Sequence, residues 1–176
     1  MKKHSPLFSS LGMAVVLCMS SFLAMATDLP SAAPSDQENA ALADAYTDFA
    51  GSSSNAHALV EGLLSGSRIT LVTRAASDGR SAQSSFMPKT GKLGYSNVRM
   101  ALALAQAALA KAQITQPTAA QIEAVLNGGA IMAPYGPAQM PGVLALRSRG
   151  QVWGNISKAL GVKLAADGNV AAANKP

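Results

Sequence analysis

Two pairs of side chains are spaced so that they could act together. Asp44 and Asp48 stand four residues apart, and so do His57 and Glu61. On a helix, this spacing places both members of a pair on one face, where they could hold an ion or share acid–base work. A tight metal site needs three or four ligands, and no second cluster accompanies either pair. We therefore predict no metal and no cofactor, and interpret both pairs as solvated helix faces.

Nucleophilic catalysis would have to use His57, because the other histidine, His4, lies in an N-terminal segment that we expect to be removed. A Ser-His-Asp site needs this histidine close to a serine and an acid in space. No serine of the chain stands in a Gly-x-Ser-x-Gly elbow. The sequence therefore gives no sign of a serine nucleophile.

The loop Gly91-Lys92-Leu93-Gly94 precedes a predicted helix start, where free backbone N–H groups can bind an anion. It lacks the Gly-x-x-x-x-Gly-Lys-Ser/Thr spacing of a nucleotide-binding loop. We interpret it as a turn that presents Lys92, Tyr95 and Asn97 as polar contacts for a partner.

Residues 147–161 combine two arginines, Arg147 and Arg149, with the only tryptophan, Trp153. A glycine turn followed by a basic helix superficially looks like a helix-turn-helix. The alternative interpretation is structural: Trp153 anchors the core, and Gly154 lets another backbone approach closely. The arginines offer forked donors to a carboxylate or phosphate, so we predict them as binding residues.

The N-terminal segment has the three parts of a secretory signal peptide. Lys2 and Lys3 lead into an apolar run over residues 11–23, and Ala24-Met25-Ala26 follows. The run is shorter than the roughly 18 apolar residues typical of a bilayer-spanning helix. We predict a signal peptide over residues 1–26 and a processed chain in the periplasm or outside the cell. Nucleic acid is then not an expected partner, and no transmembrane span remains after processing.

Cysteine usage agrees with this interpretation. The single cysteine, Cys18, lies inside the predicted signal peptide, so the processed chain has no thiol. Lipid attachment at Cys18 would need a small residue before it, whereas Leu17 is bulky and the apolar run continues beyond. An exported chain without disulfides must depend on its packed core, which about 150 residues can provide.

Charge is unevenly distributed within a chain of net charge +5. From residue 27 to 78, seven acidic residues stand against Arg68 and Arg74, whereas from 79 to 166 nine basic residues stand against Glu123 alone. This asymmetry indicates either an anionic partner or attraction between the two halves. The bases are scattered without a run of neighbours, which is equally typical of a solvated surface.

Hydrophobic spacing predicts helices over residues 37–50, 55–65, 143–149 and 152–160. Two further helices are predicted with their caps: a long alanine-rich helix capped by Ser96, and a helix that begins at the capping box Thr118-x-x-Gln121. Short β-branched or apolar runs predict strands at residues 68–73 and 84–87, joined around Asp78-Gly79, and a third at 130–133.

These elements predict a mostly α fold, a single small helical domain with a minor antiparallel β element, either a hairpin or three short strands. We expect a flexible leader at residues 27–36, the domain at 37–164 and a disordered tail at 165–176. Residues 134–141, rich in proline and glycine, are expected to form an irregular connection.

Five short motifs are distributed over residues 50–164: Asn55 with Leu59-Val60-x-Gly62-Leu63, Gly94-Tyr95-x-Asn97-Val98, Leu126-Asn127-Gly128-Gly129, Val143-Leu144-x-x-Arg147, and Gly150-x-x-Trp153-Gly154-x-Ile156. Together they resemble a family of exported proteobacterial proteins of uncharacterised function. The chain departs from the pattern at Val152 and Ser157. The resemblance implies one compact exported domain, and it implies no activity, cofactor or catalytic residue.

The sequence thus favours an exported, non-enzymatic binding or structural protein. Its expected partner is an anionic envelope polymer or an envelope protein, met by Lys92, Tyr95, Asn97, Arg147 and Arg149.

Two alternatives remain open. The chain could be a hydrolase of envelope polymers that uses Asp44, Asp48 or Glu61, which requires two of these carboxylates in one pocket. It could also be a secreted effector or a purely structural domain.

Overall fold

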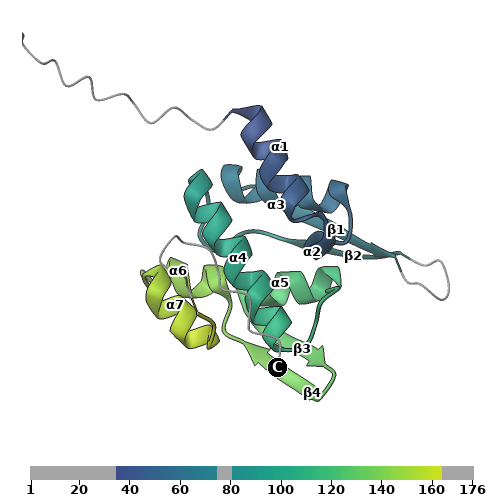
Figure 1. The fold of residues 1–176 in the computed structure, drawn as a ribbon, viewed down its shortest axis with the longest axis vertical. Coiled ribbons are helices and arrows are strands. Elements are labelled where there is room, and N and C mark those ends of the chain that lie inside the picture. The colour runs from purple at the N-terminus through teal and green to yellow at the C-terminus, as the bar shows by residue number, and fades with distance from the viewer. Residues whose placement is uncertain (1–34, 75–80, 164–176) are drawn as a thin grey trace, which may run out of the picture. The chain divides into compact units, whose positions relative to one another are not determined.

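The computed structural model describes residues 35–74 and 81–163, which contain seven helices and two pairs of antiparallel strands (Figure 1). All of these residues lie in one compact unit. The predicted mostly α fold with a minor antiparallel β element is confirmed. Within this part of the chain, no helix has the length and apolar character needed to cross a membrane. The predictions for residues 1–26 and 165–176, and for most of the leader, lie outside the described residues.

The first helix, α1 (Asp36–Ala45), begins one residue before the predicted position because a capping box starts it. The Ser35 hydroxyl accepts a hydrogen bond from the Glu38 N–H at 3.3 Å, and the Glu38 carboxylate accepts one from the Ser35 N–H at 2.8 Å. These two bonds satisfy backbone donors that an open helix end would leave free. Ser35 and Asp36 therefore belong to the helix start and not to a flexible leader.

The single helix predicted over residues 37–50 is in fact two. The chain leaves helical geometry at Tyr46, where φ is −110° and ψ is 13°, and α2 (Thr47–Ala50) follows in a new direction. This break lets Phe49 and Ala50 enter the core, where they are 3% and 2% exposed. Gly51, with φ of 78°, then ends α2 in a left-handed conformation that favours glycine.

The helix α3 (Ser53–Ser65) packs against β1 (Ile69–Arg74), which pairs with β2 (Ser81–Phe86), and β2 contacts α5. The strands are antiparallel, with Ile69 opposite Phe86, so the predicted pairing is confirmed. Ile69, Leu71 and Phe86 are buried. The predicted Asp78-Gly79 turn between the strands lies outside the described residues.

The central helix is α4 (Tyr95–Lys111), which contacts α3, α5, α6 and α7. Its buried residues are small or branched apolar side chains (Val98, Ala101, Leu102, Leu104, Ala105, Ala108 and Leu109). The alanines allow neighbouring helices to come close. The prediction that Ser96 caps this helix is wrong, because Gly94 is the N-cap and Ser96 already lies in the first turn.

The capping box predicted at Thr118 is confirmed and opens α5 (Ala119–Asn127). After it, β3 (Gly129–Ala133) pairs with β4 (Gly136–Met140), a strand in the segment that was expected to be irregular. The chain then forms α6 (Val143–Ser148) and α7 (Trp153–Leu160), which contact each other and α4. Leu144 and Ile156 are fully buried at these helices.

Candidate functional site

Three of the sequence-predicted residues meet at the start of α7. The Trp153 indole Nε1–H donates a hydrogen bond to Asn97 Oδ1 on α4 at 3.1 Å. The Arg147 guanidinium lies over the Trp153 ring, 4.9 Å from its centroid. We call Asn97, Arg147 and Trp153 the Trp153 cluster. It joins α4, the end of α6 and the start of α7, so these helices together position the ring.

Arg147 is held by a second contact besides the ring. One of its guanidinium nitrogens donates to the Gln151 carbonyl oxygen at 2.9 Å. A guanidinium over a tryptophan face gains about 0.5–1 kcal/mol at an exposed site and more when it is shielded from water. The bond to Gln151 uses one of five N–H donors, which leaves others able to bind a carboxylate or phosphate.

Trp153 is half-buried and packs against the edge of the core. Gly154 does not have the predicted role. A Cβ atom placed there would meet nothing within 4 Å, so no backbone approaches it closely. The open space beside this glycine leaves the start of α7 accessible from solvent.

The other predicted binding residues are placed differently. Arg149 and Lys92 are exposed, the first at the end of α6 and the second in the loop before α4. Tyr95 is half-buried, and its hydroxyl donates to the Glu38 carbonyl oxygen of α1 at 3.4 Å. Residues two apart on a helix point in nearly opposite directions. Tyr95 therefore faces α1 while Asn97 faces α7, and the five residues do not form one surface.

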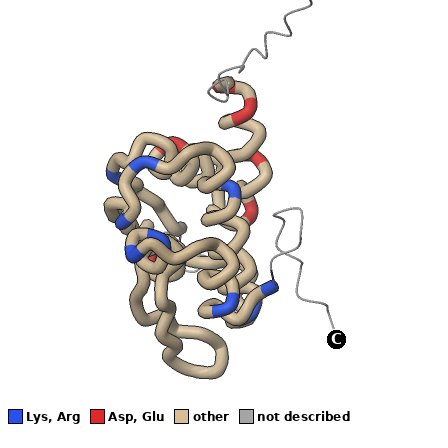
Figure 2. The backbone as a smooth tube through the Cα atoms, turned by 90° about the vertical axis from the view of Figure 1, so that its left-hand side faces the viewer, with Lys and Arg blue, Asp and Glu red and all other residues tan. Residues whose placement is uncertain are grey.

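On the described elements, acidic and basic residues are as unevenly distributed as in the sequence. Figure 2 shows acidic residues gathered along α1, whereas lysines and arginines are spread over the elements that follow. Glu123, the single acidic residue between positions 79 and 166, accepts a hydrogen bond from the Ser84 hydroxyl through its carboxylate. The surface after α3 is therefore mainly basic.

The acidic candidates do not assemble into a catalytic pair. Asp44, Asp48 and Glu61 are all exposed, and only Asp48 lines the groove described below. His57 and Glu61 share α3, but within residues 35–74 and 81–163 no three His, Cys, Asp or Glu side chains are grouped to hold a metal ion. The two-carboxylate pocket that a hydrolase would need is not formed in that groove.

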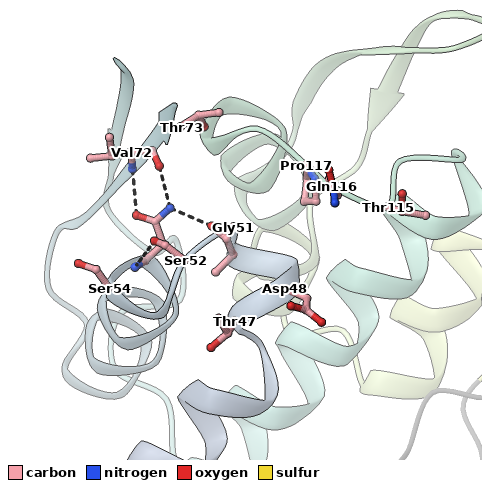
Figure 3. A pocket seen from close by; sticks show the side chains of 12 residues that line it. Thr47, Asp48, Gly51, Ser52, Ser54, Val72, Thr73, Thr115, Gln116 and Pro117 are labelled. Carbon is pink, nitrogen blue, oxygen red and sulfur yellow. Dashed lines mark hydrogen bonds between the residues drawn. The ribbon is translucent and has the colours of Figure 1, made fainter. Parts of the chain in front are cut away.

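A groove of about 1040 Å³ lies between α2, the start of α3, β1 and the loop before α5 (Figure 3). We call it the α2–α3 groove. Most of its lining residues carry hydroxyl, amide or carboxylate groups, and they come from four separate segments: Thr47, Asp48, Ala50, Gly51, Ser52, Ser54, Asn55, Val72, Thr73, Thr115, Gln116 and Pro117.

One buried side chain holds three of these segments together. Asn55 is 5% exposed. Its Nδ2 group donates to the carbonyl oxygens of Ala50 at 2.8 Å and Val72 at 2.9 Å, and its Oδ1 accepts from the Val72 N–H at 3.0 Å. The dashed lines in Figure 3 show these bonds. The amide thereby links α2, α3 and β1, and its burial is compensated by hydrogen bonds.

The fourth segment is attached through Thr73. The Ala119 N–H donates to the Thr73 hydroxyl oxygen at 2.6 Å, which ties β1 to the start of α5 and to the loop before it. On the other side, the Ser52 hydroxyl accepts from the Asn55 N–H at 3.2 Å and caps α3. Hydrogen bonds thus join α2, α3 and β1 directly, and they tie β1 to the start of α5, two residues beyond the loop that lines the groove.

The sequence-based predictions did not include the α2–α3 groove, although one signal for it was visible. Asn55 stands on the same helical face as Leu59 and Leu63, at intervals of four residues. A polar side chain on an apolar face must find hydrogen-bond partners inside the fold. Those partners, at residues 50 and 72, could not be identified from the sequence alone.

Comparison of the chain with family models, with curated proteins and with solved structures finds no match.

Proposed function

We propose that this chain is exported after removal of residues 1–26 and acts as a non-enzymatic binding protein. Its partner in this proposal is an anionic polymer of the cell envelope, which binds at the Trp153 cluster, and the exposed Arg149 at the end of α6 supplies a further positive charge. The observation that carries the proposal is the Arg147 guanidinium stacked over Trp153 at 4.9 Å, at a surface that the open space beside Gly154 leaves accessible.

The chemistry of the cluster supports an anionic partner. Tryptophan and arginine are the residues most enriched where a few side chains supply most of the binding energy. A guanidinium that is already oriented by Trp153 and by the Gln151 carbonyl loses little conformational entropy when it binds a carboxylate or phosphate. The basic residues after α3 would add long-range attraction, which salt weakens.

Retention on anionic matrices tests this proposal. Polygalacturonate coupled to agarose presents carboxylates, and phosphocellulose presents phosphates. We compare the wild type with the double variant Arg147→Ala/Arg149→Ala and with the matched control Arg68→Ala/Lys89→Ala, which removes the same charge from two exposed residues elsewhere.

The site variant should elute from both matrices at a clearly lower salt concentration than the control. Equal elution of the two variants would show that net charge alone governs retention, and the proposed site would then be wrong. An envelope protein as the partner would instead predict weak retention of all three proteins on both matrices.

Export is tested separately. The mass of the protein purified from the periplasm or the medium should correspond to a chain that begins at Thr27. An intact N-terminus in the cytosolic fraction would contradict export.

A further inference from the structure

We propose that the α2–α3 groove binds a neutral, polyhydroxylated ligand, namely a short saccharide. This inference is independent of the Trp153 cluster, because the two sites share no residue. It rests on three properties of the groove: the chemistry of its lining, the hydrogen-bond state of its hydroxyl groups, and the bonds that fix its walls.

The lining selects against charged and strongly apolar ligands. Among the described residues that line the groove there is no lysine, arginine, histidine or aromatic side chain, and Asp48 is the single charged group. An anion would be repelled by Asp48 and would find no compensating cation. A large apolar ligand would leave the surrounding hydroxyl and amide groups without partners. A neutral ligand with many hydroxyl groups avoids both costs.

Two hydroxyls of the groove already accept a hydrogen bond from the backbone. The Ser52 oxygen accepts from the Asn55 N–H, and the Thr73 oxygen accepts from the Ala119 N–H. Each hydroxyl can both accept and donate, so in each case the hydrogen is left for an acceptor in the groove. Asp48, when ionised, can only accept. Hydroxyls that can still donate, in the same groove as a carboxylate that can only accept, suit a sugar hydroxyl, which needs both.

The walls of the groove are rigid where the ligand would bind. Asn55 links α2, α3 and β1 through three side-chain hydrogen bonds, and Thr73 links β1 to α5. Binding to walls that are already ordered costs little conformational entropy. The volume of about 1040 Å³ is at the upper end of the range for small-molecule sites, which favours an oligosaccharide over a monosaccharide.

The experiment is an NMR titration of the ¹⁵N-labelled processed chain with maltotriose, cellotriose and chitotriose, each at millimolar concentration. The proposal predicts that at least one of these saccharides shifts backbone amide signals of residues 47–55, 72–73 and 115–117. Trigalacturonate serves as the anionic comparison and should leave these signals unchanged.

Two double variants make the test specific. Asp48→Asn/Ser54→Ala alters two exposed lining residues, and Asp44→Asn/Ser96→Ala makes the same chemical changes at exposed positions outside the groove. The first should raise the dissociation constant of the bound saccharide at least tenfold, and the second should leave it within twofold. The proposal is wrong if none of the three neutral saccharides shifts the groove signals, if trigalacturonate shifts them as strongly, or if both variants weaken binding equally.

Discussion

The side-chain amide of Asn55 pairs with the backbone of Val72 as an adjacent β-strand would, accepting from its N–H at 3.0 Å and donating to its carbonyl at 2.9 Å. These two backbone groups lie on the edge of β1 that faces away from β2, where unpaired groups would invite another strand. A single side chain thus occupies the Val72 position of this edge, fastens α3 to the sheet and fixes one wall of the α2–α3 groove.

Replacing Asn55 with alanine should lower the free energy of unfolding by about 2–4 kcal/mol, because the buried Ala50 carbonyl and the partly buried Val72 N–H and carbonyl lose their partners. Urea denaturation measures this change. Asn155→Ala, at an exposed asparagine of α7, is the control and should change stability by less than about 0.5 kcal/mol. Equal effects of the two substitutions would show that the Asn55 hydrogen bonds do not hold the fold.

Two glycines that flank α6 both have a positive φ but differ in how closely other atoms approach them. Gly142 and Gly150 have similar positive φ angles of 79° and 81°. A Cβ atom at Gly150 would meet nothing within 4 Å, whereas one at Gly142 would overlap the backbone of Asn127 and Gly128. Gly150→Ala should therefore cost only about 1 kcal/mol from the left-handed conformation.

Gly142→Ala should cost about 2 kcal/mol more than Gly150→Ala, because the backbone around residue 128 cannot move aside cheaply and because the ψ of 118° at Gly142 lies outside the left-handed region. The comparison is made by denaturant unfolding of both variants. If both variants lost similar amounts of unfolding free energy, Gly142 would lie farther from the end of α5 than the structure shows.

Asn97→Ala should remove the acceptor of the Trp153 indole N–H and lower the free energy of unfolding by about 1 kcal/mol. Because Trp153 is the only tryptophan, its fluorescence spectrum should also change. Ser96→Ala, at the exposed neighbouring position, should leave both the spectrum and the stability as in the wild type. An unchanged spectrum in Asn97→Ala would place the indole elsewhere.

Stability should depend on pH through Tyr46. Burial raises the pKa of Tyr46 above its ordinary value of 10.0, and the nearby Arg99 charge partly opposes this shift. The hydroxyl donates to the Arg99 carbonyl oxygen at 3.4 Å. The folded chain thus keeps the phenol proton to a higher pH than the unfolded chain does. The free energy of unfolding should accordingly decline as the pH rises above about 10.

Tyr46→Phe should make this decline shallower, because phenylalanine has no proton to lose. Urea denaturation of wild type and variant at about pH 9 and about pH 11 measures the difference. Tyr135→Phe, at a tyrosine that is 81% exposed, is the control, and its stability should decline as that of the wild type does. If the free energy of unfolding declined equally in Tyr46→Phe and in the wild type, Tyr46 would lose its proton at the same pH in the folded and unfolded states, which would contradict this prediction.

Local signals in the sequence predicted much of the secondary structure. The box at Thr118 and Gln121 and the left-handed ends at Gly66 and Gly161 depend on residues only a few positions apart, so the pattern alone locates them. The box at Ser35 and Glu38 has the same form, but it adjoins a segment rich in small residues that resembled a leader.

The elements that were missed depend on the tertiary structure. Within β4, Gly136 and Pro137 have low strand propensity, and this strand forms because β3 pairs with it. The break at Tyr46 has no glycine or proline to mark it, and it follows from the burial of Phe49. The helix and strand propensities of single residues do not indicate strand pairing or burial, so they could not predict either feature.

The candidate sites were predicted only in part, for the same reason. The sequence identified Asn97, Arg147 and Trp153 as separate residues, but the hydrogen bond between Asn97 and Trp153 joins positions 56 residues apart. The α2–α3 groove needs three stretches of the chain, residues 47–55, 72–73 and 115–117, that meet only in the fold. Residue type indicates which side chains can bind, whereas their proximity comes from packing.

The most direct test of the proposed function uses Trp153 itself, because the single tryptophan lies in the proposed binding site. Soluble polygalacturonate is titrated into the processed chain at low ionic strength while tryptophan emission is recorded, and salt is then added. We predict a saturable change in emission that salt reverses, and a much weaker change in Arg147→Ala/Arg149→Ala. Binding of the polymer with no change in Trp153 emission would contradict the proposal and place the basic contact surface elsewhere on the chain.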